Sequence, residues 1–314
     1  MPDDLRDLSL TTFQKEFFLR RIKAARHLSQ TLIPRFLDTA LIRNFENEIS
    51  FFPTLAYDTY FNGEFERIVI NRTVNENRKN ERLSDYSQIK YPPLEIEKKL
   101  DYNRASLKGQ SVFYGGAGSL PAILETRPEL GDLYTVSKWR QKKGTSIYHL
   151  PIFYNNAIYE RPEFEKDWQE HNQLISTLDP NVQEVVSEFL SFMTEVFIKK
   201  VDKDNKVGYI FSSLFADYFL TKAKPPVQCM YYPSVASNYV ASNIACLPHT
   251  LDELFECVEI NECLCIHHNG SKQWGSRRIA QAININPRAV GKIEWELNVT
   301  ELEYTLLKKQ YHLN

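Results

Sequence analysis

A guanidinium, a phenol and a carboxylate stand close together around one short stretch of the sequence, SVFYGGAGSLPAILE. Tyr114 ends an apolar run, Glu125 follows it by eleven residues, and Arg104 precedes it by ten. Arginine forms paired hydrogen bonds with phosphate, tyrosine stacks on flat rings, and a carboxylate stabilises positive charge at a ribosyl carbon. The three residue types together fit a nucleotide, and a structural ion pair is the alternative.

The glycines of this stretch are the next candidates, because glycine-rich turns can cradle phosphates. A dinucleotide-binding turn requires the pattern Gly-x-Gly-x-x-Gly after a strand. Gly116 and Gly118 supply the first half, but Pro121 occupies the position of the third glycine. No Gly-Lys-Ser/Thr follows, which excludes a P-loop. We therefore expect a tight turn in which glycine adopts an unusual φ.

Ser234 and a group of cysteines and histidines are two further candidates. Ser234 follows a strand-like run in YYPSVAS, where its hydroxyl serves either a ligand or the turn itself. Cys263, Cys265 and His267 alternate along ECLCIHH, which predicts a strand with these three side chains on one face. Their spacing is not the Cys-x-x-Cys of zinc sites, so we expect no metal centre.

The start of the chain is typical of a helix that begins with a cap. Thr11 and Gln14 have the spacing of a capping box, and apolar residues recur at helical spacing over 11–47. This helix also has a basic face, which predicts either a solvated surface or an interaction surface. The basic residues are Lys15, Arg20, Arg21, Lys23 and Arg26.

The remaining elements give a mixed α+β pattern. Strands are expected at 65–75 (ending at Arg72), 111–114, 133–141, 146–154 and 227–232, with a loop over 76–100. Helices are expected at 119–126, after Asp179-Pro180, after Gly208 until Pro225, and after a capping box at Thr300 and Glu303. The fold class is therefore α+β, with a β region at 65–155 and 227–266 and helices inserted between its parts.

Composition narrows the class of protein. The chain has 314 residues, of which 43% are hydrophobic and 25% charged, as in a globular protein. A net charge of -2 argues against a nucleic-acid partner. No apolar run is long enough to span a membrane, and the N-terminus does not resemble a secretory leader. Five cysteines without an even framework fit a reducing cytoplasm.

Two blocks of the sequence resemble the RES-domain family, which is named for an arginine, a glutamate and a serine. NRASLKGQSVFYGGAGSLPAILE is similar to one family block, and YYPSVASNYVASNIACLP is similar to another that follows it in the same order. The resemblance spans residues 65–250, roughly. It matches family positions to Arg104, Tyr114, Glu125, Ser234 and Asn243, and it sets Arg72 where members have an early strand arginine.

The resemblance implies a fold similar to the ADP-ribosyltransferase toxins, with NAD as substrate and no tightly bound cofactor. Family members degrade NAD by phosphorolysis or hydrolysis, or transfer ADP-ribose to a protein, and many are toxins held by an antitoxin protein. A partner of this kind, or a second copy of the chain, is therefore expected. The implied organisation is a helical N-terminal extension at 1–60, a catalytic domain at 61–250, and a C-terminal strand and helix at 251–314 that complete it.

The hypothesis that follows is cleavage of the nicotinamide–ribose bond. Glu125 would stabilise an oxocarbenium-like transition state, while Arg104 and Arg72 neutralise the pyrophosphate. Tyr114 would pack on nicotinamide or ribose, and Ser234 would orient the nicotinamide end. Phosphate, water and a protein side chain all remain open as acceptors. A catalytically inactive module that binds a nucleotide or a partner is the alternative outside enzymes.

Overall fold

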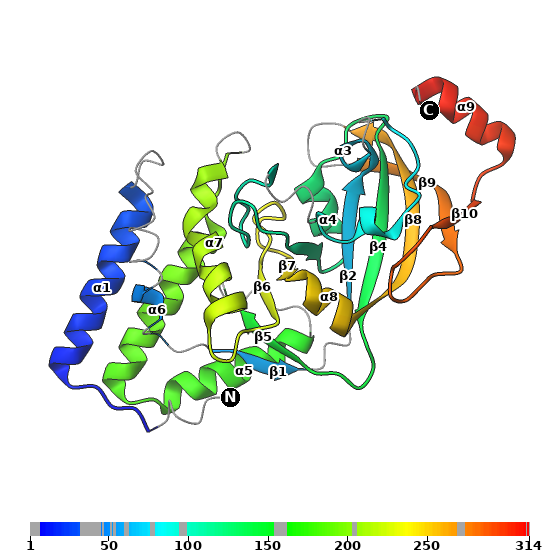
Figure 1. Ribbon diagram of the computed structural model, residues 1–314. Helices are drawn as coiled ribbons and strands as arrows, with labels where there is room; N and C mark the ends of the chain where they lie inside the picture. Colours follow the sequence, from blue (N-terminus) through cyan, green and yellow to red (C-terminus); the bar gives the residue numbers. More distant parts are fainter. Residues whose placement is uncertain are drawn as a thin grey trace.

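The fold is built on one long, mostly antiparallel sheet (Figure 1). The computed structural model describes residues 7–31, 45, 47–50, 52, 55–59, 63–75, 79–93, 99–153, 162–202, 206–268, 274–311 and 313. In spatial order the strands are β1 (Tyr57–Thr59), β5 (Ile147–Pro151), β6 (Cys229–Pro233), β7 (Ser242–Cys246), β3 (Phe113–Gly116), β2 (Glu64–Ile70), β4 (Leu133–Gln141), β8 (Phe255–His268), β9 (Trp274–Ile283) and β10 (Glu294–Leu297). Among the strands that the structure describes, only β5 and β6 pair in parallel. The predicted α+β class is confirmed.

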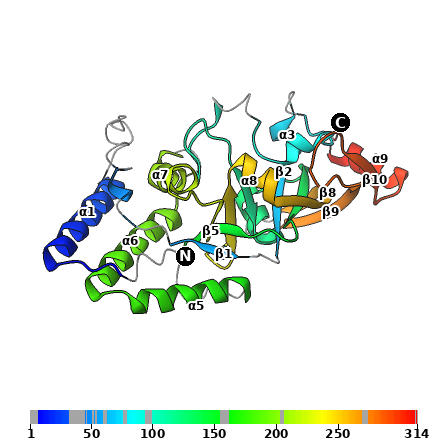
Figure 2. The same ribbon diagram turned by 60° about the horizontal axis from the view of Figure 1, so that its bottom comes forward.

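One group of helices covers one end of this sheet, and shorter helices lie along the rest of it. The first group is α1 (Thr12–Thr31), α5 (Pro162–Thr177), α6 (Pro180–Ile198), the 3-10 turn η6 (Lys206–Tyr209), α7 (Ile210–Asp217) and the π-helical turn η7 (Tyr218–Lys222). The others are α3 (Asn71–Val74), the 3-10 turn η3 (Tyr86–Ile89), α4 (Ser119–Thr126), α8 (Pro248–Leu254) and α9 (Glu301–Tyr311). Figure 2 shows α5 beside β1 and β5. Among the described residues, no helix has the length and apolar character needed to cross a membrane.

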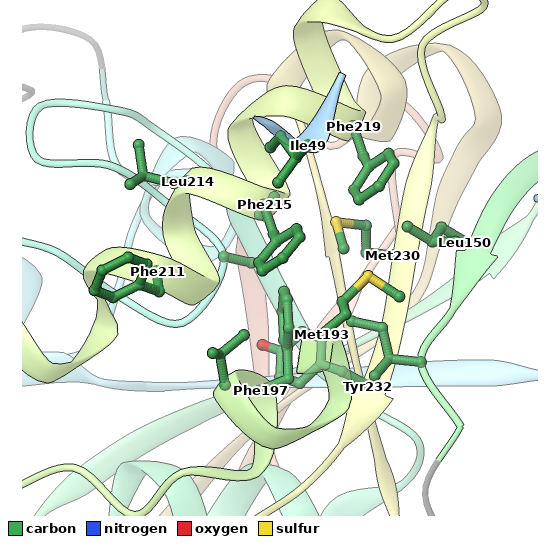
Figure 3. Close-up of a cluster of buried hydrophobic side chains, with 14 of the residues drawn as sticks. Ile49, Leu150, Met193, Phe197, Phe211, Leu214, Phe215, Phe219, Met230 and Tyr232 are labelled. Atoms are coloured by element: carbon green, nitrogen blue, oxygen red, sulfur yellow. The ribbon is translucent and has the colours of Figure 1, made fainter. Parts of the chain in front are cut away.

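The helices from α5 to α7 are inserted between β5 and β6, as the sequence predicts. Asp179 caps α6, because its carboxylate accepts hydrogen bonds from the backbone N–H groups of Asn181 (3.0 Å) and Val182 (3.3 Å). The apolar positions of α6 and α7 then pack against β6 in a shared core, part of which Figure 3 shows around Phe215 and Met230. This core fixes the helical layer to the sheet.

Several predicted boundaries differ from the observed ones. The strand predicted at 65–75 ends at Ile70, because the buried Asn71 side chain donates to the Glu81 carbonyl (3.0 Å) and accepts from Thr135 Oγ1 (2.9 Å), and α3 follows. The strand predicted at 111–114 lies at Phe113–Gly116, so two of the glycines belong to a strand. The first helix ends at Thr31, and 32–44 lie outside the described residues.

The sheet continues across both ends of the implied catalytic domain. β1 lies before residue 61 and pairs with β5. After residue 250, β8 pairs with β4, and β9 and β10 extend the same sheet. β8 carries Cys263, Cys265 and His267, and two irregularities in its pairing with β9 interrupt the simple alternation expected for these side chains.

The basic face of α1 serves largely to hold that helix on α6. Lys15 Nζ lies 2.9 Å from Glu184, and Arg26 bonds Glu188 and, at 2.8 Å, Glu195. Three of these acidic residues are on α6, and a fourth, Glu48, bonds Arg21. Neither a fully solvated face nor an open interaction surface describes these three basic side chains, because intramolecular carboxylates neutralise them.

Replacing Arg26 by alanine is expected to lower the free energy of unfolding by about 1–2 kcal/mol, because two ion pairs and the packing of the side chain on Phe192 are lost together. Arg20→Ala is the matched control, since Arg20 is exposed and, among the described residues, bonds only the Glu16 carbonyl. Its effect should stay within about 0.5 kcal/mol. Urea denaturation at low and high salt measures both. Equal effects of the two substitutions would contradict the role assigned to Arg26.

His171 on α5 supplies a pH-dependent contribution to stability. Its ring is buried against Phe153 and Trp168, and Nδ1 lies 3.0 Å from the Tyr57 hydroxyl. Burial disfavours the charged imidazolium and lowers the pKa of His171 to about 4. Between this value and the ordinary pKa near 6.5, the unfolded chain binds the proton and the folded chain does not, so stability falls as the pH falls.

Acidification from pH 7 to pH 5 should therefore remove about 2 kcal/mol of stability through this one group. In His171→Gln, which keeps a hydrogen-bonding side chain, the loss between the two pH values should be smaller than in the wild type by that amount. Urea denaturation of both proteins at pH 7 and pH 5 checks it. An identical pH dependence in the two would show that His171 titrates normally.

Candidate functional site

A cavity of about 500 Å³ opens where the sheet narrows between β2 and β3. These two strands pair only at Glu66 and Gly116, whereas β2 pairs with β4 along its whole length. The volume lies within the range of about 300–1,000 Å³ that is usual for small-molecule sites. The polar side chains that line the cavity include Arg67, Arg104, Tyr114, Glu125, Lys206 and Asn243.

Strand register sets one wall of the cavity. Tyr232 on β6 pairs with Asn243 on β7, Asn243 pairs with Gly116 on β3, and Gly116 pairs with Glu66 on β2. All four residues line the cavity. A single row across four strands therefore brings together an aromatic ring, an amide and a carboxylate that lie far apart in the sequence.

Glu125 lies on α4, and hydrogen bonds from two other residues hold one of its carboxylate oxygens in place. Oε1 accepts hydrogen bonds from the hydroxyl of Ser234 (3.0 Å) and from the side-chain amide of Asn243 (3.1 Å). Ser234 is fully buried, and its Oγ also accepts from the Ser237 N–H at 3.3 Å. Within the described part of the chain, no donor bonds Oε2. The carboxylate is thus oriented through one oxygen, while the other is left without a partner among the described residues.

Gly116 allows α4 to lie close enough for this contact. A Cβ atom at Gly116 would come within 2.8 Å of Pro121 Cγ and 2.9 Å of the Ala122 backbone nitrogen. Gly118, just before the helix, has φ of 98°, a conformation that glycine adopts readily. The expected turn with unusual φ is therefore confirmed at Gly118, while Gly116 has a second role in close strand–helix packing.

Tyr114 supports the turn that carries Arg104. Its hydroxyl donates to Ser106 Oγ (2.9 Å) and accepts from the Ala105 N–H (3.1 Å), and burial raises its pKa well above the ordinary value. Because the hydroxyl is engaged in these bonds, Tyr114 offers its ring rather than its oxygen to the cavity. The phenol is also too weak an acid to carry charge at neutral pH.

Arg104 lies between the end of α6 and η6. Its Nη1 donates to the carbonyls of Phe197 and Lys199, the latter at 3.1 Å, and its guanidinium carbon lies 4.9 Å from the centre of the Tyr209 ring. A cation at this position also interacts favourably with the negative, C-terminal end of the α6 dipole. Nη2 and Nε make no bond to any described residue, so they remain available to a ligand.

Arg67 is a cavity residue that the sequence reasoning missed. It lies on β2, its Nη1 donates to the Tyr114 carbonyl at 3.0 Å, and its buried Nε has no hydrogen-bond partner among the described residues. Burial lowers the pKa of Arg67 to about 10, so it is still charged at neutral pH. The available signal was the pair of charged residues, Glu66 and Arg67, inside the strand-like run FERIVI.

Arg72, the early strand arginine expected to bind the pyrophosphate, lies away from the cavity. It follows the end of β2 and bonds Asp132 at 2.6 Å and Glu129 at 3.1 Å. Arg104, Tyr114, Glu125 and Asn243 do line the cavity together, whereas Ser234 lies buried behind Glu125 and does not line it. The site therefore brings four of the six expected residues to one space.

The sequence matches no protein-family model and no curated protein. In the ranges that the structure describes, no group of three or more His, Cys, Asp or Glu side chains has the arrangement of a metal site.

Gly116→Ala is expected to destabilise the protein by about 1–3 kcal/mol, because the added methyl meets a proline ring and a backbone nitrogen that cannot move without displacing α4. Gly115→Ala is the comparison, since its nearest neighbours are side-chain atoms of Ile244 and Phe113 at 3.1 and 3.2 Å. Urea denaturation and amide exchange in α4 measure the difference. A larger effect at Gly115 would contradict the packing argument.

Proposed function

We propose that the cavity binds NAD and that Glu125 assists cleavage of the nicotinamide–ribose bond by phosphate or water. The observation that carries this proposal is the Glu125 carboxylate, which is fixed at Oε1 by Ser234 and Asn243 and free at Oε2 beside a cavity lined with cations. The resemblance to the RES-domain family supports the same assignment, because Glu125 matches the family glutamate.

The chemistry needs an anion more than it needs an acid. The bond breaks through an oxocarbenium-like transition state, and nicotinamide is already cationic in NAD, so it leaves as a neutral molecule without protonation. A fixed carboxylate near the ribose stabilises the developing positive charge, an effect worth about 3–4 kcal/mol for one well-placed group. The free Oε2 of Glu125 would also accept a hydrogen bond from a ribose hydroxyl.

The other cavity residues fit the remainder of the substrate. The Arg67 and Arg104 guanidinium groups are suited to the pyrophosphate, and the rings of Tyr114 and Tyr232 supply flat apolar surface. Ser234 acts in this proposal as a positioning residue, because it is fully buried and touches Glu125 rather than the cavity. This differs from the contact with nicotinamide expected from the sequence.

The ADP-ribosyltransferase-like fold belongs to the same proposal. A mostly antiparallel sheet that narrows between β2 and β3, with a glutamate on the helix after β3, is consistent with it. We also propose that the protein acts in a reducing, cytoplasmic compartment, which fits its five free cysteines. A role as a toxin or defence effector would follow from loss of cellular NAD.

The test is to incubate the protein with NAD, with and without inorganic phosphate, and to identify the products by mass. Free nicotinamide with ADP-ribose indicates hydrolysis, and free nicotinamide with a phosphorylated ADP-ribose indicates phosphorolysis. ADP-ribose attached to protein would instead indicate transfer. Intact NAD under all conditions would contradict the proposal.

Glu125→Gln should reduce the rate of nicotinamide release by about 10²–10³-fold, because the amide keeps the shape of the side chain and removes its charge. Glu129→Gln is the matched control: it is the same substitution on a nearby exposed side chain that bonds Arg72 and does not line the cavity. Its rate should equal that of the wild type. Rates measured at saturating NAD separate the two variants, and equal losses would exclude a specific role for Glu125.

A further inference from the structure

The inserted helical layer reaches the cavity through one short turn. Lys206 and Tyr209, the first and last residues of η6, both line the cavity. Side chains three positions apart in a 3-10 helix lie on the same side, which explains why both face the same space. Gly208 holds this turn against Val201, whose methyl carbons would lie 3.0 Å from an added Cβ.

Tyr209 and Arg104 form a flat surface whose orientation is fixed. The guanidinium carbon of Arg104 lies 4.9 Å from the centre of the Tyr209 ring, and its Nη1 is tied to two carbonyls at the end of α6. The carbonyl of Ile198, which lies between those of Phe197 and Lys199 in the chain, accepts a hydrogen bond from the Tyr239 hydroxyl at 3.4 Å. A preorganised pair of planar groups loses little freedom when a flat ring stacks on it.

Lys206 places a second kind of recognition beside this surface. Lys206 is partly buried, and none of the described carboxylates pairs with its ammonium group. An ammonium group on a flexible side chain suits a phosphate oxygen. A planar surface next to an unpaired cation is the combination that a purine nucleotide with phosphate groups requires.

The Lys206–Tyr209 turn and Glu125 enter the cavity from different elements. Glu125 is on α4, which follows β3, whereas the turn belongs to the helices inserted between β5 and β6. In Figure 1, α7, which begins directly after η6, lies on the opposite side of β6 from α4. The two ends of an elongated ligand would therefore meet different groups.

We propose that Lys206 and Tyr209 form a subsite for the adenosine diphosphate half of the substrate, with the base stacked on the Tyr209–Arg104 pair and a phosphate bound by Lys206. This inference rests on the proposed function, because it takes the other half of the dinucleotide to lie at Glu125. The inserted helices then determine that the protein accepts a dinucleotide in preference to a nicotinamide mononucleotide.

The experiment measures binding without requiring turnover. Calorimetric titration with ADP, and separately with nicotinamide mononucleotide, is carried out on the full chain and on Tyr209→Leu and Lys206→Gln. Each substitution should weaken ADP binding about tenfold, through loss of stacking or of a charged hydrogen bond. Binding of nicotinamide mononucleotide should not change.

Two matched controls separate this subsite from a general loss of structure. Tyr209→Phe keeps the ring and should bind ADP like the wild type, while Lys200→Gln removes an exposed lysine near the end of α6 that does not line the cavity. Denaturation curves show whether each variant is folded. Unchanged ADP affinity in Tyr209→Leu and Lys206→Gln, or no ADP binding by the wild type, would overturn the subsite.

The outcome also separates this inference from the proposed function. If ADP binding depends on both side chains and NAD remains intact in the product assay, the subsite is supported and the proposed cleavage is contradicted. If NAD is cleaved and ADP affinity is the same in all variants, the cleavage is supported and the subsite is overturned.

Discussion

The two hydrogen bonds to Glu125 Oε1 are the constraint on which the site depends. They come from residues 109 and 118 positions later in the chain, so they exist only when β7 lies beside β3 and α4 lies directly on that pair. Gly116 makes the second condition sterically possible, since any side chain there would meet α4. Ser234 also depends on Glu125, because its hydroxyl is buried and a buried hydroxyl without its acceptor costs about 1–3 kcal/mol. The carboxylate and the core beneath it therefore stabilise each other.

A second set of contacts links the N-terminal helix to the same cavity. α1 is held on α6 by ion pairs, and the last carbonyls of α6 accept hydrogen bonds from Arg104. Arg104 in turn directly precedes Ala105 and Ser106, the two residues that the Tyr114 hydroxyl anchors. A single guanidinium therefore satisfies a helix end and faces the cavity, and only the donors not used by α6 remain for a phosphate. Arg67, whose charge is not neutralised by any ion pair among the described residues, therefore brings a second guanidinium to the cavity that the sequence analysis did not include.

Local signals predicted much of the fold, and long-range pairing explains the rest. The helix at 119–126 and the strand at 133–141 were predicted with their observed bounds, because proline, glycine and alternation mark them clearly. The strand predicted at 65–75 was too long, because the sequence pattern does not show that the chain turns at Asn71. Only the contacts of the Asn71 side chain with Glu81 and Thr135 show that the strand ends there. Neither the pairing of α1 with acidic residues of α6 nor the sheet order follows from any local pattern.

The candidate site shows the same division. Arg104, Tyr114 and Glu125 could be grouped because they lie around one strand–helix corner in the sequence, and the family resemblance added Asn243 from another segment. Lys206 and Tyr209 had no such signal, since a 3-10 turn between two helices has no extended periodicity to read.

Arg67 lies within β2, whereas Arg72 lies just after its end. The alternating pattern of the sequence continues through the polar Asn71, but the observed strand ends at Ile70. Arg72 follows that end and lies outside the cavity, whereas Arg67 lines it. The arginine that lines the cavity is therefore distinguished from the one that does not by the element that carries it, and the end of that element depends on the hydrogen bonds of Asn71.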